Sequence, residues 1–398
     1  MNLSDAQINN LLKNSQYEDV IKNLCEIVKT DNATFNNYYA FIEAVVSFLD
    51  TKNYPLAYNC FIKANFLENK NSENLKKLYK KAETIIKYLG FNYFNDNNTY
   101  KIQRDFYLRA RFMLYMYATK YQNALDTLSV MIKENPSSEN FYIRSKFYIM
   151  QNKYKFALQD INTAISINTN KADYYFNRAL LKQKSNNDEA LNDFDTAITI
   201  EPENYLFYYS RGIYQESKKN FKNAIDDFKK TLQLEPNHTL SVIEISWCYY
   251  KMLKYEEAYN FANAAVKMEQ NNSSCYYVRG TIENAGKMYE EAKSDLEKGI
   301  QLDNKTDKIW SSKLYYQKAW AEYKLSNNTQ AQTDIQQALK LCPNQIAYLI
   351  LAMDIEFFGT KNYYNAQGFC REILKIDSEN RRAILAQEKI TDMIHDEI

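Results

Sequence analysis

The sequence of 398 residues contains little glycine and little proline, with seven and five occurrences. A β-sandwich or a β-barrel needs many tight turns, and tight turns favour these two residue types. An α/β enzyme needs glycines where strands meet helices. The scarcity of both argues against these fold classes and predicts helices joined by short, repetitive turns.

Residues suited to metal binding or acid–base chemistry are also scarce. Histidine occurs twice, at His238 and His395. The six cysteines are far apart in sequence, and no pair has the spacing of metal ligands. We therefore expect no metal, no cofactor and no histidine-based catalytic site. The cysteines are typical of small core residues in a reducing compartment.

Charge and apolar runs give no sign of nucleic acid or membrane binding. The 50 basic and 49 acidic residues give a net charge of +1, without a long basic run of the kind that holds a nucleic-acid backbone. No apolar stretch is long enough to span a bilayer, and the N-terminus has no signal core. We expect a soluble cytoplasmic protein, with ciliary or mitochondrial association left open. The sequence also has no phosphate-binding loop or nucleophile elbow, so we expect no enzymatic activity.

An aromatic residue followed three places later by alanine recurs along the chain. The pairs are Tyr121–Ala124, Tyr154–Ala157, Phe221–Ala224, Tyr255–Ala258, Tyr289–Ala292 and Tyr363–Ala366. Ala190 and Ala331 fit the same series, whose steps are 33, 33, 34, 34, 34, 39 and 35 residues. Four prolines each lie 12 residues after one of these alanines: Pro136, Pro202, Pro236 and Pro343. Because proline cannot continue a helix, each of them marks the end of a unit's second helix.

Residues 205–238 carry the fullest copy of the pattern. Gly212 is the small residue of the first helix, Phe221 and Ala224 open the second, and Pro236 ends the unit. This copy resembles the 34-residue tetratricopeptide repeat, and residues 273–306 repeat it. The resemblance implies an all-α fold, a right-handed superhelix of stacked helix pairs. A single pair cannot bury its own apolar face, so the units must stack.

The repeat also predicts the organisation of the chain. We expect degenerate repeat-like helical units at 1–90, including a long helix near 72–90, a linker at 91–104, about eight repeats over 105–380 and a capping helix at 381–398. The repeats are placed at 105–138, 138–171, 172–204, 205–238, 239–272, 273–306, 312–345 and 347–380. An insertion of five residues near 306–312 is expected to lengthen one turn between units.

The resemblance implies a binding groove on the concave side, lined by the first helix of each unit. The second, fifth, ninth and twelfth places of each unit would face it. The candidate partner-binding residues are Tyr142, Phe176, Leu180, Tyr209, Ile213, Trp247, Tyr250, Tyr277, Tyr316, Trp320 and Tyr323. Trp and Tyr dominate interface hot spots, which favours these residues as anchors. The alternative is that tight curvature buries the same side chains between neighbouring helices.

Three functions follow from this interpretation. The first is a non-enzymatic protein-binding scaffold or adaptor, as a subunit of a larger ciliary, mitochondrial or cell-cycle assembly. The second is a chaperone-like helper that holds apolar client segments. The carboxylate clamp of co-chaperone members is absent, because Tyr142, Lys146, Leu206 and Ser210 stand where it needs Lys, Asn, Lys and Arg. The third is an RNA-processing helical repeat protein, which would need a basic groove.

Overall fold

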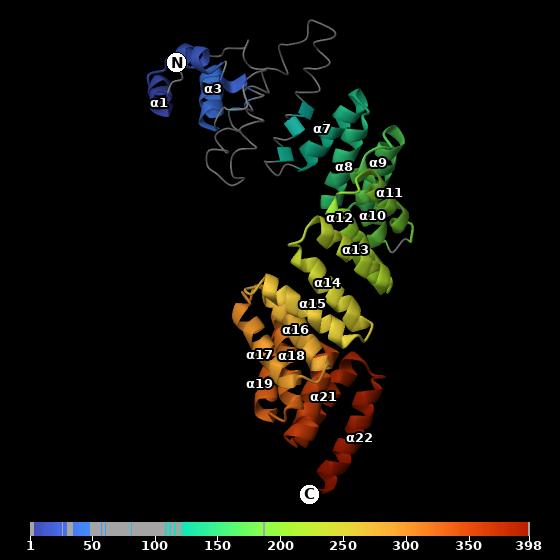
Figure 1. The fold of residues 1–398 in the computed structure, drawn as a ribbon. Helices are drawn as coiled ribbons and strands as arrows, with labels where there is room; N and C mark the ends of the chain where they lie inside the picture. The colour runs from blue at the N-terminus through green and yellow to red at the C-terminus, as the bar shows by residue number, and fades with distance from the viewer. Residues whose placement is uncertain are drawn as a thin grey trace. The chain divides into compact units, whose positions relative to one another are not determined.

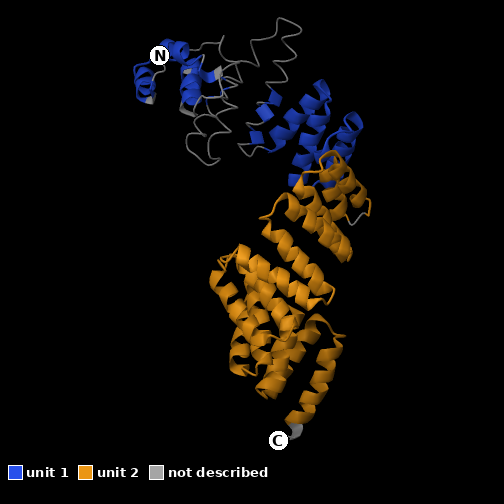
Figure 2. Ribbon diagram, in the orientation of Figure 1, with its two compact units in different colours: residues 1–174 blue, residues 175–398 orange. Residues whose placement is uncertain are grey.

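The computed structural model describes residues 4–25, 27–29, 35–47, 57, 60, 81, 108–109, 111–112, 115–116, 121–185 and 188–396. The predicted linker at 91–104 and nearly all of the long helix predicted near 72–90 lie outside these residues. The chain divides into two compact units, residues 1–174 and residues 175–398 (Figure 2). Every regular element in the described part is a helix, which confirms the predicted all-α fold (Figure 1).

Unit 1 contains two groups of described helices. The N-terminal group is α1 (Asp5–Lys13), α2 (Tyr17–Leu24), η1 (Ile27–Lys29) and α3 (Phe35–Ser47). The second group is α7 (Tyr121–Glu134), α8 (Ser138–Met150), α9 (Tyr154–Ile167) and the first residues of α10 (Ala172–Lys184). α8 and α9 pack against each other as the helix pair predicted for 138–171.

Unit 2 is a serial stack of helix pairs. After α10 come α11 (Ala190–Ile200), α12 (Tyr205–Ser217), α13 (Phe221–Leu234), α14 (Thr239–Lys251), α15 (Tyr255–Met268), α16 (Ser273–Ala285), α17 (Tyr289–Leu302), α18 (Lys308–Lys324), α19 (Asn328–Leu341), α20 (Ile346–Asp354), η3 (Ile355–Gly359), α21 (Tyr363–Ile376) and α22 (Arg381–Asp396). From α12 to α19 each helix packs on the next one in the chain. Pro202, Pro236 and Pro343 each stand two residues beyond the end of a second helix, as predicted.

The two helices of a repeat approach closely where the first helix has a small residue. A Cβ atom added to Gly212 would lie 2.6 Å from Cε1 of Phe228, and one added to Gly280 would lie 2.7 Å from Cγ of Leu296. Phe228 and Leu296 are fully buried. The small residue therefore lets a large apolar side chain of the second helix reach the backbone of the first.

In seven helix pairs whose turn the structure describes, that turn contains a residue in the left-handed backbone region. These residues stand two places before the second helix and have φ between 56° and 64°: Ser15, Asn152, Lys219, Leu253, Lys287, Ser326 and Lys361. Glycine adopts this conformation without strain, whereas an L side chain is strained by its Cβ atom. None of the seven is glycine, so the chain tolerates this strain once per described turn.

A charged pair joins the two helices in five of the repeats. Each pair links the seventh residue of the repeat, on the first helix, to an aspartate of the second helix: Arg144–Asp160, Arg178–Asp193, Arg211–Asp227, Arg279–Asp295 and Lys318–Asp334. The aspartates are almost fully buried. In the repeat 239–272 the corresponding residues are Ile245 and Phe261, which belong to one hydrophobic cluster. These pairs were not predicted from the sequence.

The insertion near 306–312 mainly extends a helix, and the prediction that it lengthens a turn is wrong. α18 has 17 residues, whereas α12, α14 and α16 have 13 each. Asp307 caps the extended helix, since its carboxylate accepts hydrogen bonds from the backbone N–H groups of Ile309 and Trp310. A capped N-terminus satisfies donors that the first turn leaves unpaired, which stabilises the added turn.

The one extra residue of the last repeat is taken up by a π-helical turn. Ala331 and Ala366 are 35 residues apart, one more than the usual step of 34. Between them, η3 continues α20 as a π-helix over Ile355–Gly359. A π-bulge accommodates an extra residue inside a helix. The side chain of Glu356 holds this turn, since it accepts hydrogen bonds from Gln332 and Thr360.

Candidate functional site

The first helices of the repeats form one side of unit 2. α12, α14, α16 and α18 contact one another in addition to their own second helices. Helices on the inner side of a curved stack lie closer together than those on the outer side. The first helices therefore line the concave side of this stack.

All eleven candidate groove residues lie on first helices, and each of them is partly buried. Tyr142 is on α8 in unit 1, and the other ten are in unit 2. Phe176 packs on the buried Phe194 and Phe207, with ring centroids 6.1 Å and 4.8 Å apart. Tyr209 lies 5.8 Å from the buried Phe228. Phe176 and Tyr209 therefore pack on the core and expose only part of their surface.

Aromatic side chains on successive first helices also contact one another. Trp247 lies edge-on to Tyr250 at 5.4 Å and packs on Tyr277 at 6.1 Å. Tyr277 in turn contacts Trp310 at 4.9 Å. Trp310 stands on the helical turn that the insertion adds to α18 and was not among the predicted groove residues. Mutual contact accounts for part of the burial of these residues.

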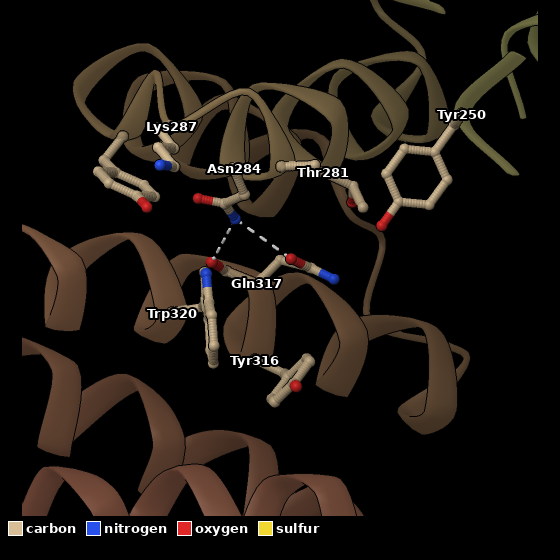
Figure 3. A pocket seen from close by; sticks show the side chains of 9 residues that line it. Tyr250, Thr281, Asn284, Lys287, Tyr316, Gln317 and Trp320 are labelled. Carbon is tan, nitrogen blue, oxygen red and sulfur yellow. Dashed lines mark hydrogen bonds between the residues drawn. The ribbon is translucent and has the colours of Figure 1, made fainter. Parts of the chain in front are cut away.

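Three of the candidate residues line a pocket between α14, α16 and α18. Its volume is about 350 Å³, and Tyr250, Tyr316 and Trp320 form its aromatic walls (Figure 3). The remaining lining residues are Thr281, Asn284, Ala285, Lys287, Tyr289 and Gln317. The structure thus brings Tyr250, Tyr316 and Trp320 together around one cavity, while Tyr323 and the other candidates lie outside its lining.

Asn284 is a buried polar residue in the lining of this pocket. The residue is 6% exposed. Its Nδ2 donates to the backbone oxygen of Gln317 at 3.0 Å and to Oε1 of the same residue at 3.1 Å. Its Oδ1 is buried without a hydrogen-bond partner among the described residues. The sequence could have pointed to Asn284, which occupies the twelfth place of its repeat, one of the places expected to face the groove.

Positive charge predominates at this pocket. Lys287 is exposed and is the one charged residue of the nine that line it. Nζ of Lys324 lies 4.7 Å from the centroid of the Trp320 ring, within the range of a cation–π contact. No carboxylate belongs to the lining.

The groove has a different character around α12 and α14. Burial, together with the neighbouring Glu216, raises the pKa of Glu244 to about 7. Glu216 also forms an ion pair of 2.8 Å with Lys251. Burial and the charge of Glu244 raise the pKa of Tyr209 to about 12. This end of the groove is therefore acidic and has one carboxyl group that titrates near neutral pH.

Comparisons with known proteins identify the repeats. Sequence models of the tetratricopeptide repeat match residues 178–238, and then residues 273–306 and 312–345. The last two ranges coincide with two units expected from the alanine and proline spacing. These residues are therefore tetratricopeptide repeats, and the described helix pairs have the fold of that repeat.

One curated relative and two solved structures show what the chain is similar to. Anaphase-promoting complex subunit 3 of Schizosaccharomyces pombe is 23% identical over 167 residues, which are 42% of this chain and 24% of that protein. The match therefore spans about a quarter of the relative's length. A tetratricopeptide repeat protein from Parabacteroides merdae is 19% identical with a TM-score of 0.51, over 64% of this chain and 99% of that one. Yeast Tom70 is 17% identical with a TM-score of 0.47, over 98% and 95%.

None of the described helices has both the length and the apolar character that a membrane span needs.

Proposed function

We propose that the chain is a non-enzymatic scaffold or adaptor that binds protein partners along the groove formed by its first helices. The observation that supports this most directly is the pocket walled by Tyr250, Tyr316 and Trp320. Partly exposed aromatic side chains around a cavity are typical of interface anchors, because they bury a large area at a small cost in entropy. Phe176 and Tyr209, which pack on the core, form part of the floor of the groove.

We propose further that the chain acts as a subunit of a larger assembly. Its similarity to a subunit of the anaphase-promoting complex supports this role. A scaffold of this kind is expected to purify with a few partners in stoichiometric amounts. A chaperone-like helper would instead purify with many partners, each in a small amount.

Affinity purification of the full chain followed by mass spectrometry tests both points. Trp320→Ala and Trp247→Ala are expected to lose the stoichiometric partners while the melting temperature changes little. The matched control is Tyr364→Ala on the second helix α21, where the side chain is 64% exposed and lies outside the groove. Retention of every partner by both tryptophan variants would contradict the groove as the binding site. Loss of the fold in both would instead favour a purely structural role for these residues.

A further inference from the structure

The pocket between α14, α16 and α18 contains a buried acceptor that no described residue satisfies. Asn284 is more than nine-tenths buried, and its Oδ1 has no hydrogen-bond partner, although its Nδ2 makes two hydrogen bonds to Gln317. Figure 3 shows its amide between the helices, among the side chains that line the cavity. Buried polar atoms almost always have a partner. An unsatisfied carbonyl oxygen at a cavity therefore favours a ligand that brings an N–H or O–H donor.

The charges around the pocket restrict the ligand further. Lys287 makes no ion pair in the described part of the chain, and Lys324 lies over the Trp320 ring. A cationic group would be repelled by both lysines. A phosphate group is usually held by the fork of an arginine, and no arginine lines the pocket. One ammonium group at the mouth of the pocket matches a single carboxylate.

The size and the walls of the pocket restrict the shape of the ligand. A volume of about 350 Å³ lies at the lower end of the range of small-ligand pockets. It accommodates a residue of extended chain rather than a helix. The rings of Tyr316 and Trp320 provide apolar surface for the methylene groups of a side chain.

We infer that this pocket binds an aspartate or glutamate side chain from within an extended segment of the partner protein. The carboxylate of the bound residue accepts a hydrogen bond from Nζ of Lys287. The backbone N–H of that bound aspartate or glutamate donates to Oδ1 of Asn284. The side-chain methylene groups lie against Trp320 and Tyr316. This inference rests on the proposed function, because it specifies the chemistry of the partner at the groove.

Fluorine NMR of the full chain labelled with 5-fluorotryptophan tests the inference. The sequence has three tryptophans, Trp247, Trp310 and Trp320, so the three resonances can be assigned with single Trp→Phe variants. The probe is N-acetyl-glutamate N-methylamide, a blocked internal acidic residue. It is expected to shift the Trp320 resonance in a saturable manner. The glutamine analogue is expected to bind roughly tenfold more weakly, because it lacks the charged acceptor.

Two lysine variants give a matched comparison. Lys287→Asn removes the charge while keeping a residue that tolerates the left-handed backbone at this position, where φ is 63°. It is expected to weaken binding of the glutamate probe by roughly tenfold as well. Lys219→Asn makes the same change at the same place of the repeat 205–238, where φ is also 63°. Lys219 does not line this pocket, so binding is expected to stay unchanged.

Several results would overturn the inference. They are an unshifted Trp320 resonance, equal binding of the glutamate and glutamine probes, and binding that Lys287→Asn does not weaken. A third probe, N-acetyl-alanine, carries a free terminal carboxylate, and tighter binding of this probe would assign the pocket to a chain terminus instead. If these tests fail while Trp320→Ala still loses its partners, the scaffold role stands and only the acidic ligand is wrong. If both Trp320→Ala and Trp247→Ala keep every partner, the proposed function itself fails.

Discussion

Arg144 of α8 and Asp160 of α9 are joined by two parallel hydrogen bonds of 2.7 Å each. The aspartate is almost fully buried, and the arginine is partly buried. A planar guanidinium matches a carboxylate in this geometry, so the pair fixes the register of the two helices as well as neutralising the buried charge. The chain itself offers a substitute for the pair, since Ile245 and Phe261 take the same two places in the repeat 239–272.

This substitute leads to a prediction about stability. Arg144→Ile leaves Asp160 buried without its partner and is expected to lower the free energy of unfolding by about 3 kcal/mol. The double variant Arg144→Ile/Asp160→Phe is expected to recover most of this loss, because an apolar pair of adequate size can replace a buried ion pair. Urea denaturation of both variants measures the difference. A double variant that is less stable than the single variant would show that the site cannot be repacked in this way.

Leu253 offers a position where a substitution should stabilise the fold. It has φ of 60° and is 71% exposed, so its side chain adds strain and little packing. Leu253→Gly is expected to raise the free energy of unfolding by about 0.5–1 kcal/mol, after allowance for the greater entropy of glycine in the unfolded chain. Thermal denaturation measures the change. Leu253→Ala is the control, since it removes the same exposed side chain but keeps the Cβ atom, and it should give no gain.

Gly212 and Gly368 should respond in opposite directions to the same substitution. Gly212→Ala places a Cβ atom 2.6 Å from the Phe228 ring and is expected to destabilise the fold by about 1–3 kcal/mol. Gly368 lies within α21, and a Cβ atom there would meet no atom within 4 Å. Gly368→Ala is therefore expected to stabilise the fold by about 0.5–1 kcal/mol. The melting temperatures of the two variants, each compared with that of the wild type, measure these effects. Equal changes in melting temperature would contradict the close approach of α12 and α13.

The raised pKa of Glu244 predicts a dependence of stability on pH. Its folded pKa of about 7 lies above its ordinary value of 4.5, so the folded state binds more protons between these two values. Stability from this group is therefore present at low pH and is lost as the pH rises through about 7. Glu244→Gln should remove that loss. Its free energy of unfolding, relative to that of the wild type, should therefore be about 2 kcal/mol higher at pH 8 than at pH 5. Chemical denaturation at both pH values measures it.

A matched variant separates this effect from a general loss of charge. Glu203 is exposed in the turn before α12, and Glu203→Gln is expected to follow the wild type at both pH values. If the two variants behave alike, the carboxyl group of Glu244 does not titrate in this range.

Periodic features of the fold could be predicted from the sequence because they depend on local physics. Proline ends a helix wherever it falls beyond the first turn, so Pro202, Pro236 and Pro343 gave the ends of α11, α13 and α19 correctly. The position of the insertion was also visible, but its effect was not. Whether five residues extend a turn or a helix depends on capping, and here Asp307 provides the cap for α18.

The pocket was predictable only in part, because it depends on which side chains of neighbouring repeats face each other. Tyr250, Tyr316 and Trp320 were expected from their places in the repeat. Asn284 also stands at a place that was expected to face the groove, but it was not among the candidates, since its importance comes from an unsatisfied oxygen that depends on the position of Gln317, 33 residues further along. The charged pairs were missed for a related reason. A single arginine and a single aspartate 16 residues apart look like ordinary surface residues until the helices are paired.

The π-helical turn at Ile355–Gly359 allows this repeat to be one residue longer without a change in how its helices stack. The additional residue widens the backbone locally, so α21 still begins at Tyr363 with Ala366 buried in its usual place. A single-codon insertion at such a site therefore disturbs neither the neighbouring repeat nor its contacts. Genes for stacked helical arrays can in this way lengthen or shorten by one residue without a change in architecture.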